Sequence, residues 1–380
     1  MRSTVLCLFL VLSALVRPAF AADQILIPAP PELGAKAYIL VDYNSGRVLA
    51  EKNADQRLEP ASLTKIMTAY VIFRELAKGN LKLTDMVTVS EKAWRTEGSR
   101  MFAQVGAQIP VEDLLKGMIV QSGNDASVAL AEHVAGDESV FAQMMNQNAE
   151  RLGMKNTHFK NSMGLPDPEH YTTARDLSIL TRAMIEEFPE YYKWHSIKEF
   201  LFNNIKQTNR NRLLWRDPTV DGVKTGHTEG AGYCLVTSAV REGMRMIAVV
   251  LGTKSDNERA NANQALLNYG FRFFETRPLY KANEKLSEAR VWKGDSTELP
   301  LGLNKDFYVT FPRGQYQNLK ASMEINNMIT APVQQGDKLG AVKVAFNDQI
   351  VGQTDLVALK PVQEGGIFRR AIDSLQLLWK

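Results

Sequence analysis

The feature that most constrains the fold is a hairpin near the N-terminus that is separated by a run of helices from two later strands. The hairpin covers residues 37–51, with a turn at 42–46, and strand patterns return at 232–240 and 245–251. Apolar residues at three- and four-residue spacing predict helices at 62–77, 111–120, 126–134, 140–152, 173–188 and 261–274. We therefore expect an α/β domain whose sheet joins both ends of this region, with helices packed around it.

The last quarter of the chain has a different character. Short strand-like runs at 307–311 and 342–346 are separated by turn residues, which indicates a small all-β domain. A chain of 380 residues also exceeds the length of about 150 that is typical of one domain. We expect a catalytic domain over 22–281 and an all-β domain over 282–364, with the boundary near 277–283.

The N-terminus is typical of a cleaved secretory signal peptide over residues 1–21. Arg2 precedes an apolar run from Val5 to Val16, and small residues stand at Ala19 and Ala21. An uncleaved anchor is the alternative, but this run is shorter than the roughly 20 residues that a membrane span needs. The mature chain keeps one cysteine, Cys234, so an exported protein of this kind must be stable without an internal disulfide.

The C-terminus, residues 365–380, predicts an amphipathic membrane-anchoring helix. From Ile367 onward the large apolar side chains gather on one face, apart from Leu377, and the charged residues lie outside that face. A helix over 367–380 is about 21 Å long, too short to cross about 30 Å of hydrocarbon, but it can lie in the membrane surface. The alternative is a last helix that packs on the protein itself.

Charge and missing motifs exclude several classes of function. Removing residues 1–21, which hold Arg2 and Arg17 and no acid, leaves 43 basic and 42 acidic residues, so nothing indicates nucleic-acid binding. The five histidines form no HExxH pair and there is no CxxC motif, so we expect no metal. GxSxG and GxxxxGK[ST] are absent as well, and we expect no cofactor.

Three short motifs occur in a fixed order. S-x-x-K at Ser62–Lys65 opens a predicted helix, S-x-N at Ser122–Asn124 lies between helices, and K-T-G at Lys224–Gly226 precedes a strand. S-x-x-K alone is weak, because about one copy is expected by chance in a chain of this length. A capping serine with a solvated lysine would explain that motif alone, but it would not explain all three in this order.

With these motifs the chain resembles the penicillin-recognising serine enzymes, most closely the low-molecular-mass penicillin-binding proteins that are D-alanyl-D-alanine carboxypeptidases. The resemblance extends to 60–68, 122–126, 224–228 and 270–274, and 162–167 is similar to the loop of the peptidases. It implies a transpeptidase-like domain with a five-stranded antiparallel sheet, then a small β-sandwich. It also implies a periplasmic enzyme, peripheral on the inner membrane, that removes the terminal D-alanine from peptidoglycan pentapeptides and is acylated by β-lactam antibiotics.

The resemblance also assigns roles to residues of this sequence. Ser62 is expected to be the nucleophile, Lys65 its base and Ser122 the proton relay to the leaving amine. The substrate is expected to contact Asn124, Lys224, Thr225, His227, Arg259 and Arg210, with Thr225 and Arg259 at its terminal carboxylate and the backbone N–H groups of Ser62 and His227 as the oxyanion hole. Asp125, Arg57 and Asp221 lie beside the motifs, and we expect them to be structural.

A base at Lys65 must be neutral, although lysine has an ordinary pKa near 10.4. Half-neutral lysine at pH 7 requires about 4.6 kcal/mol. A second ammonium at Lys224, about 4 Å away, would supply roughly 4 kcal/mol at an effective dielectric of 20. We therefore expect Lys224 to be the main cause of the lowered pKa, with desolvation supplying the rest.

Two other functions fit parts of the sequence. A class A-like β-lactamase shares the S-x-x-K and K-T-G motifs, but it carries S-D-N where this chain has Gly123. A non-enzymatic wall-binding scaffold would keep the β domain and terminal helix and would not need Ser62 or Lys65. Release of D-alanine separates the carboxypeptidase from both.

Overall fold

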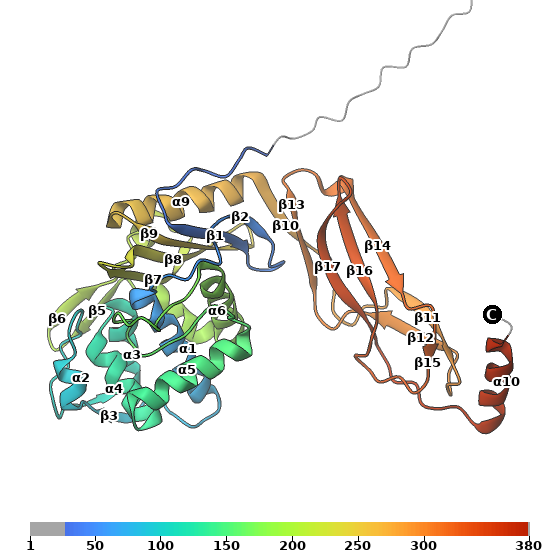
Figure 1. Ribbon diagram of the computed structural model, residues 1–380, viewed down its shortest axis with the longest axis horizontal. Coiled ribbons are helices and arrows are strands. Elements are labelled where there is room, and N and C mark those ends of the chain that lie inside the picture. Colours follow the sequence, from blue (N-terminus) through green and yellow to red (C-terminus); the bar gives the residue numbers. More distant parts are fainter. Residues whose placement is uncertain (1–26, 379–380) are drawn as a thin grey trace, which may run out of the picture.

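The computed structural model describes residues 27–378, so the predicted signal peptide, Trp379 and Lys380 lie outside the described residues. The described chain forms a mixed α/β part followed by an elongated β part, and a last helix lies at the far end of the latter (Figure 1). Cys234 is a buried free thiol.

The first part is built on a five-stranded antiparallel sheet, as expected. The inner strand of its hairpin pairs with a strand from the end of the domain, so that Ile39 lies opposite Val249. Two late strands pair beside it, with Thr225 opposite Leu235. The strand order is β2 (Val48–Lys52), β1 (Ala37–Asp42), β9 (Met244–Thr253), β8 (Gly232–Arg241) and β7 (Val220–Thr228).

The two faces of this sheet bury two separate cores, because successive strand side chains point to opposite sides. Ile39 and Val249 pack with the helical lobe that contains Ile66, whereas Leu40 and Val250 pack against α9 (Asp256–Phe273). The helical lobe contains α1 (Thr64–Ala77), α2 (Glu91–Arg95), α3 (Val111–Val120), α4 (Asn124–Ala135), α5 (Glu138–Leu152), α6 (Ala174–Glu187) and α7 (Pro189–Tyr192).

Local sequence explains where the longer helices start. Asp137, Thr173 and Ser255 are N-caps whose side chains accept a hydrogen bond from a backbone N–H of the first turn of α5, α6 and α9. The shorter elements around the lobe are η1 (Ala61–Leu63), β3 (Met86–Thr88), β4 (Gln108–Pro110), η2 (Lys193–Ser196), β5 (Glu199–Phe202), β6 (Ile205–Thr208) and α8 (Leu213–Arg216).

The second part is all β, with a core of its own that includes Val309, Phe311, Val342 and Leu356. One sheet has the order β14-β16-β17-β12-β11-β15, and β10 pairs with β13 in a second sheet. The strands are β10 (Phe274–Tyr280), β11 (Ser287–Trp292), β12 (Glu298–Gly302), β13 (Phe307–Pro312), β14 (Leu319–Ile325), β15 (Ile329–Thr330), β16 (Lys338–Phe346) and β17 (Gln349–Ala358), with η3 at Tyr316–Asn318.

Buried polar groups join the two parts. Thr310 on β13 lies 2.6 Å from Ser45 and 2.7 Å from Thr276, hydroxyl to hydroxyl, and its carbonyl accepts a hydrogen bond from Arg47 at 2.6 Å. Ser45 and Thr276 both donate to the buried carboxylate of Asp42 at the end of β1. The catalytic sheet and the β part are therefore linked by a hydrogen-bonded cluster in which each of these side chains has a partner.

The last helix, α10 (Ile367–Leu377), docks on the β part through its polar side. Asp373 is buried, accepts a hydrogen bond from the backbone N–H of Lys293, and lies 3.8 Å from Arg290. The apolar side chains stay exposed: Ile367, Phe368, Ile372, Leu375 and Leu378. The alternative in which the apolar face packs on the protein is therefore not what the structure shows. Among residues 27–378, no helix is long and apolar enough to cross a bilayer.

Candidate active site

Ser62 lies in the 3₁₀ turn η1 that leads directly into α1, one turn before Lys65. The Nζ atom of Lys65 is 3.1 Å from the Oγ atom of Ser62. Ala61, the residue before the serine, has a left-handed φ of 48°, which is uncommon for a residue with a Cβ. Such outliers cluster at functional sites, where the surrounding structure maintains them.

Lys65 is held in a fully buried position between three oxygen atoms. Besides Ser62, its Nζ donates to the Oδ1 of Asn124 and to the carbonyl of Met163, both at 2.7 Å. Burial is the largest cause that lowers the pKa of Lys65, to about 7, and the positive charge of Arg210 lowers it further. The prediction that Lys224 is the main cause differs from this ranking, because the sequence does not reveal how completely Lys65 is buried.

Ser122 and Lys224 form a second hydroxyl–amine pair on the opposite wall. Lys224 Nζ lies 2.9 Å from Ser122 Oγ, and the lysine is buried in strand β7. Ser122 has a left-handed φ of 66° in the loop between α3 and α4. Burial first, and the charge of Lys65 next, lower the pKa of Lys224 well below its ordinary value. The charge of Lys65 therefore reaches Lys224, and each lysine contacts a serine hydroxyl that lines the same cavity.

The side chain of Asn124, two residues after Ser122, has two hydrogen-bond partners. Its Oδ1 accepts from Lys65, and its Nδ2 donates to the carbonyl of Glu97. Asp125 beside it accepts hydrogen bonds from the backbone N–H groups of Met101 and Ala103, which fits the structural role expected for it. Asn124 thus positions Lys65 in the structure described.

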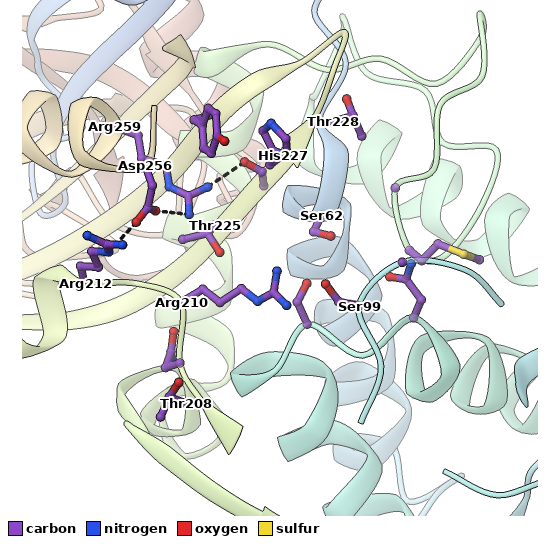
Figure 2. A pocket seen from close by; sticks show the side chains of 18 of the residues that line it. Ser62, Ser99, Thr208, Arg210, Arg212, Thr225, His227, Thr228, Asp256 and Arg259 are labelled. Atoms are coloured by element: carbon purple, nitrogen blue, oxygen red, sulfur yellow. Dashed lines mark hydrogen bonds and ion pairs between the residues drawn. The ribbon is translucent and has the colours of Figure 1, made fainter. Parts of the chain in front are cut away.

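The two arginines at the other end of the cavity differ in their partners. Arg259 is buried, donates to the carbonyl of Gly226 at 3.0 Å and forms an ion pair with Asp256, which also pairs with Arg212. Arg210 has neither an ion pair nor a hydrogen bond within residues 27–378. Figure 2 shows it reaching toward the middle of the pocket from the side of Thr208. Arg210 is therefore the cation that is free to receive an anion.

The backbone at Arg210 is held by its two neighbours. It lies between Asn209 and Asn211, both buried, and Asn211 Nδ2 donates to the carbonyl of Gly222 in β7 at 3.0 Å. Thr225 lines the same end of the cavity from β7, whereas His227 is exposed and stacks on Tyr233 with ring centroids 4.0 Å apart.

A loop at residues 161–170 contributes a part of the site for which no role was assigned from the sequence. A Cβ on Gly164 would lie 1.9 Å from the carbonyl oxygen of Ala61, so only glycine fits at this position, where φ is +92°. His170 is buried, and its Nε2 lies 2.8 Å from Thr64 Oγ1. This loop therefore holds Lys65 through the Met163 carbonyl and packs against Ala61, the residue before Ser62.

All nine residues assigned to the site from the sequence lie in or against one cavity of about 910 Å³. Its walls include Ser62, Ser122, Asn124, Arg210, Thr225, His227 and Arg259, and the buried Lys65 and Lys224 contact Ser62 and Ser122. Residues not predicted also line it: Ser99, Leu165, Thr208, Arg212, Trp215 and Tyr233. Within the described part of the chain, no group of three or more His, Cys, Asp or Glu could hold a metal ion.

Two protein families together match most of the chain. Residues 24–255 match the family described as D-alanyl-D-alanine carboxypeptidase, and residues 274–364 match the family of the penicillin-binding protein 5 C-terminal domain. The chain is 48% identical to the D-alanyl-D-alanine carboxypeptidase DacC of Escherichia coli over 94% of this chain and 91% of that one. It is 42% identical to DacA of the same organism, over 99% and 95%.

Solved structures show the same similarity in three dimensions. Penicillin-binding protein 5 from Haemophilus influenzae matches with a TM-score of 0.85 at 43% identity, covering 89% of this chain and 100% of that one. The carboxypeptidase DacD from Francisella tularensis matches with a TM-score of 0.76 at 36% identity, covering 90% and 97%.

The close contact at Gly164 predicts that Gly164→Ala slows acylation by a penicillin about 10²-fold, because Ala61 and the adjacent Ser62 must move. The acylation rate with labelled penicillin measures this. Gly79→Ala is the matched control, since Gly79 also has a left-handed φ, +77°, but has nothing within 4 Å. Equal rates in the two variants would contradict the proposed contact.

The pKa of Lys65 predicts that the acylation rate rises as the pH increases through about 7, because the neutral amine is the form that accepts a proton. Arg210→Gln removes a charge that lowers this pKa, so the midpoint should move to higher pH. The pH dependence of acylation tests this, with the exposed Arg272→Gln as the control. A midpoint unchanged by Arg210→Gln would show that the guanidinium does not influence the base.

Proposed function

The chain belongs to the D-alanyl-D-alanine carboxypeptidase family, and on this basis we propose that Ser62 is the nucleophile that releases the terminal D-alanine from peptidoglycan pentapeptide stems. The observation that supports this most strongly is the fully buried Lys65 with its Nζ 3.1 Å from Ser62 Oγ. The family and its match to penicillin-binding proteins also support acylation by β-lactam antibiotics.

In the first step, neutral Lys65 accepts the proton of Ser62 while Oγ attacks the carbonyl between the two D-alanines. A lysine with a pKa of about 7 is half neutral near pH 7, whereas an ordinary lysine is almost entirely charged. The Met163 carbonyl and the Asn124 amide oxygen have no proton to give, so Ser62 is the partner of Nζ with a transferable proton. Burial of Lys65 therefore makes its neutral amine available as the base.

The tetrahedral intermediate needs donors for its oxygen and a proton for the leaving amine. We assign the first role to the backbone N–H groups of Ser62 and His227, which lie on the two walls that meet at the serine. Ser122, which lies 2.9 Å from Lys224, would carry the proton to the amine. The C–N bond then breaks, D-alanine leaves, and water hydrolyses the ester on Ser62.

Recognition of the terminal carboxylate is assigned to Arg210 and Thr225, with Arg259 in support. Arg210 has no partner among the described side chains, so a carboxylate could form a bidentate pair with it without displacing another anion. Arg259 is already engaged by Asp256 and Gly226, and its charge adds to the positive potential. This differs from the expectation that Arg259 contacts the carboxylate directly.

The β-lactamase and scaffold alternatives have less support. The β part and α10 extend well away from the catalytic cavity, as a wall-associated protein would need (Figure 1). A scaffold would not require a lysine buried against Ser62, since burying an amine costs free energy without contributing to binding elsewhere.

We also propose that α10 holds the protein on the outer face of the inner membrane after export. Five large apolar side chains of this segment are exposed, Phe368 at 88% and Ile367 at 83% among them. Each could gain about 1.5–3 kcal/mol if fully buried in the membrane surface. Because the helix is already formed and docked through Asp373, less ordering entropy opposes its insertion.

The proposed function predicts that Ser62→Ala loses both labelling by penicillin and release of D-alanine from a diacetyl-Lys-D-Ala-D-Ala peptide, by about 10³-fold or more. Gel fluorography and a D-alanine assay measure the two effects. Ser322→Ala, an exposed serine in β14, is the control. Absence of both activities in the unaltered protein would end this proposal, and activity in Ser62→Ala would end the assignment of the nucleophile.

The membrane role predicts that Phe368→Asp combined with Leu375→Asp abolishes sedimentation with phospholipid vesicles, because charges on this face oppose insertion. The matched control is Met328→Asp with Ile350→Asp, which changes two side chains of the β part that are 60% and 58% exposed. Vesicle binding that survives the first pair and is lost with the second would place the membrane contact elsewhere.

A further inference from the structure

The residues along the catalytic cavity determine the direction in which a substrate would lie. Arg210, Thr225 and Arg259 lie on one side of Ser62, and Thr228 lies on the other (Figure 2). A substrate whose terminal carboxylate pairs with Arg210 therefore extends past Ser62 toward Thr228. The residue that precedes the two D-alanines must leave the cavity at this end.

A second cavity of about 630 Å³ adjoins the cleft near Thr228. It is lined by Arg57, Leu58, Glu59, Pro166, Asp167, Pro168, His170 and Tyr171. Thr228, which lines the catalytic cavity, donates to the Oε2 of Glu59 at 3.1 Å. The loop from Gly164 to Pro168 contributes Gly164 and Leu165 to the first cavity and Pro166–Pro168 to the second. The two cavities therefore share a wall.

Arg57, Glu59 and Asp167, the charged side chains around the second cavity, form no ion pair within 4 Å among residues 27–378. Arg57 stacks over Tyr171, 4.6 Å from the ring centroid, and donates to Asn156, but it has no carboxylate within 4 Å among residues 27–378. Glu59 contacts Thr228 and Asp167 accepts from the backbone N–H of Glu169, and neither forms an ion pair in the same range. Nearby Lys160 is paired with Glu169, and the charge of Asp167 adds to that of Glu169 in raising the pKa of Lys160.

The charges of Arg57, Glu59 and Asp167 indicate what kind of ligand group the second cavity could bind. One guanidinium held in place by an aromatic ring, with donors left over, can receive a carboxylate. Two carboxylates that form no ion pair favour an ammonium group, and together the three charged side chains suit a ligand group that carries both a carboxylate and an ammonium. An ordinary structural role would instead pair Arg57 with an acid, as Arg175 nearby is paired with Glu51 and Asp55.

We propose that this second cavity is a specificity subsite for the stem residue that precedes the two D-alanines. It would bind a side chain that ends in an amino-acid group, with the carboxylate at Arg57 and the ammonium at Glu59 and Asp167. This inference rests on the proposed function, because it takes the direction of the substrate from Ser62 and Arg210. Arg57, which was expected to be structural, becomes a substrate-binding residue.

The test compares three tripeptides that end in D-Ala-D-Ala and differ in the first residue: meso-diaminopimelate, lysine with a free ε-amine, and Nε-acetyl-lysine. The full-length protein should release D-alanine from the first with a kcat/KM about tenfold above that for the third, and from the second with an intermediate value. The ratio is taken within one preparation, so a partly folded variant does not distort it.

Each charge should change the ratio in its own way. Arg57→Gln should lower the value for the diaminopimelyl peptide to that of the lysyl peptide. Glu59→Gln and Asp167→Asn, which keep their hydrogen-bond acceptors, should reduce the advantage of both ammonium peptides over acetyl-lysine. Lys320→Gln and Asp348→Asn remove the same charges from exposed sites of the β part and should change no ratio.

The outcomes separate the two proposals. Equal kcat/KM for all three peptides, or ratios unaffected by Arg57→Gln, would overturn the subsite and leave the carboxypeptidase intact. Release from none of the peptides, with no labelling by penicillin, would overturn the proposed function and the subsite with it.

Discussion

The site depends on the burial of one amine. Lys65 is almost completely buried, and its three oxygen partners come from different parts of the chain: the 3₁₀ turn at Ser62, the start of α4 at Asn124, and the segment at Met163. A charged amine in that place is costly, so the pKa falls until the neutral form is available. The helical lobe and the loop at residues 161–170 together enclose this amine and keep it buried.

The enclosure also explains several local departures from favourable backbone geometry. Ala61 and Ser122 both adopt left-handed conformations beside the two reactive hydroxyls, and Gly164 approaches Ala61 more closely than any side chain would permit. Such conformations persist only when neighbouring packing determines them. Here that packing comes from α1, α4 and β7, which are among the most thoroughly buried elements of the domain. Stability elsewhere in the fold therefore maintains an unfavourable arrangement at the site.

Much of this could be predicted from the sequence, and the failures have physical causes. The sequence pattern located β1, β2, β8 and β9 because they are short, largely apolar runs, and it located the main helices because each has one buried face. Strand β7 was not recognised by pattern, since Gly222, Lys224 and Gly226 replace the apolar alternation that a buried strand normally shows. The hairpin of β5 and β6 was missed as well, because Leu201 and Ile205 are exposed and no periodic face results.

For the site, too, the sequence predicted residues in short local motifs but could not predict contacts that only folding creates. The three motifs identified Ser62, Lys65, Ser122 and Lys224, because family resemblance attaches to short stretches of sequence. The distinction between Arg210 and Arg259 could not be made in advance, since it depends on Asp256 and Gly226, which are brought near Arg259 by folding. In the same way, the role of Met163 belongs to its backbone carbonyl and leaves no trace in the residue type.

The hydrogen-bonded link between Asp42 and Thr310, together with the docking of α10 through Asp373, has a consequence for geometry. With α10 in a lipid surface, the catalytic cavity would stay at a nearly constant distance from the membrane, and the length of the β part would set that distance (Figure 1). The enzyme would then reach only a thin layer of the wall. Peptidoglycan strands nearer to the lipid or farther from it would not be trimmed, whatever their chemistry.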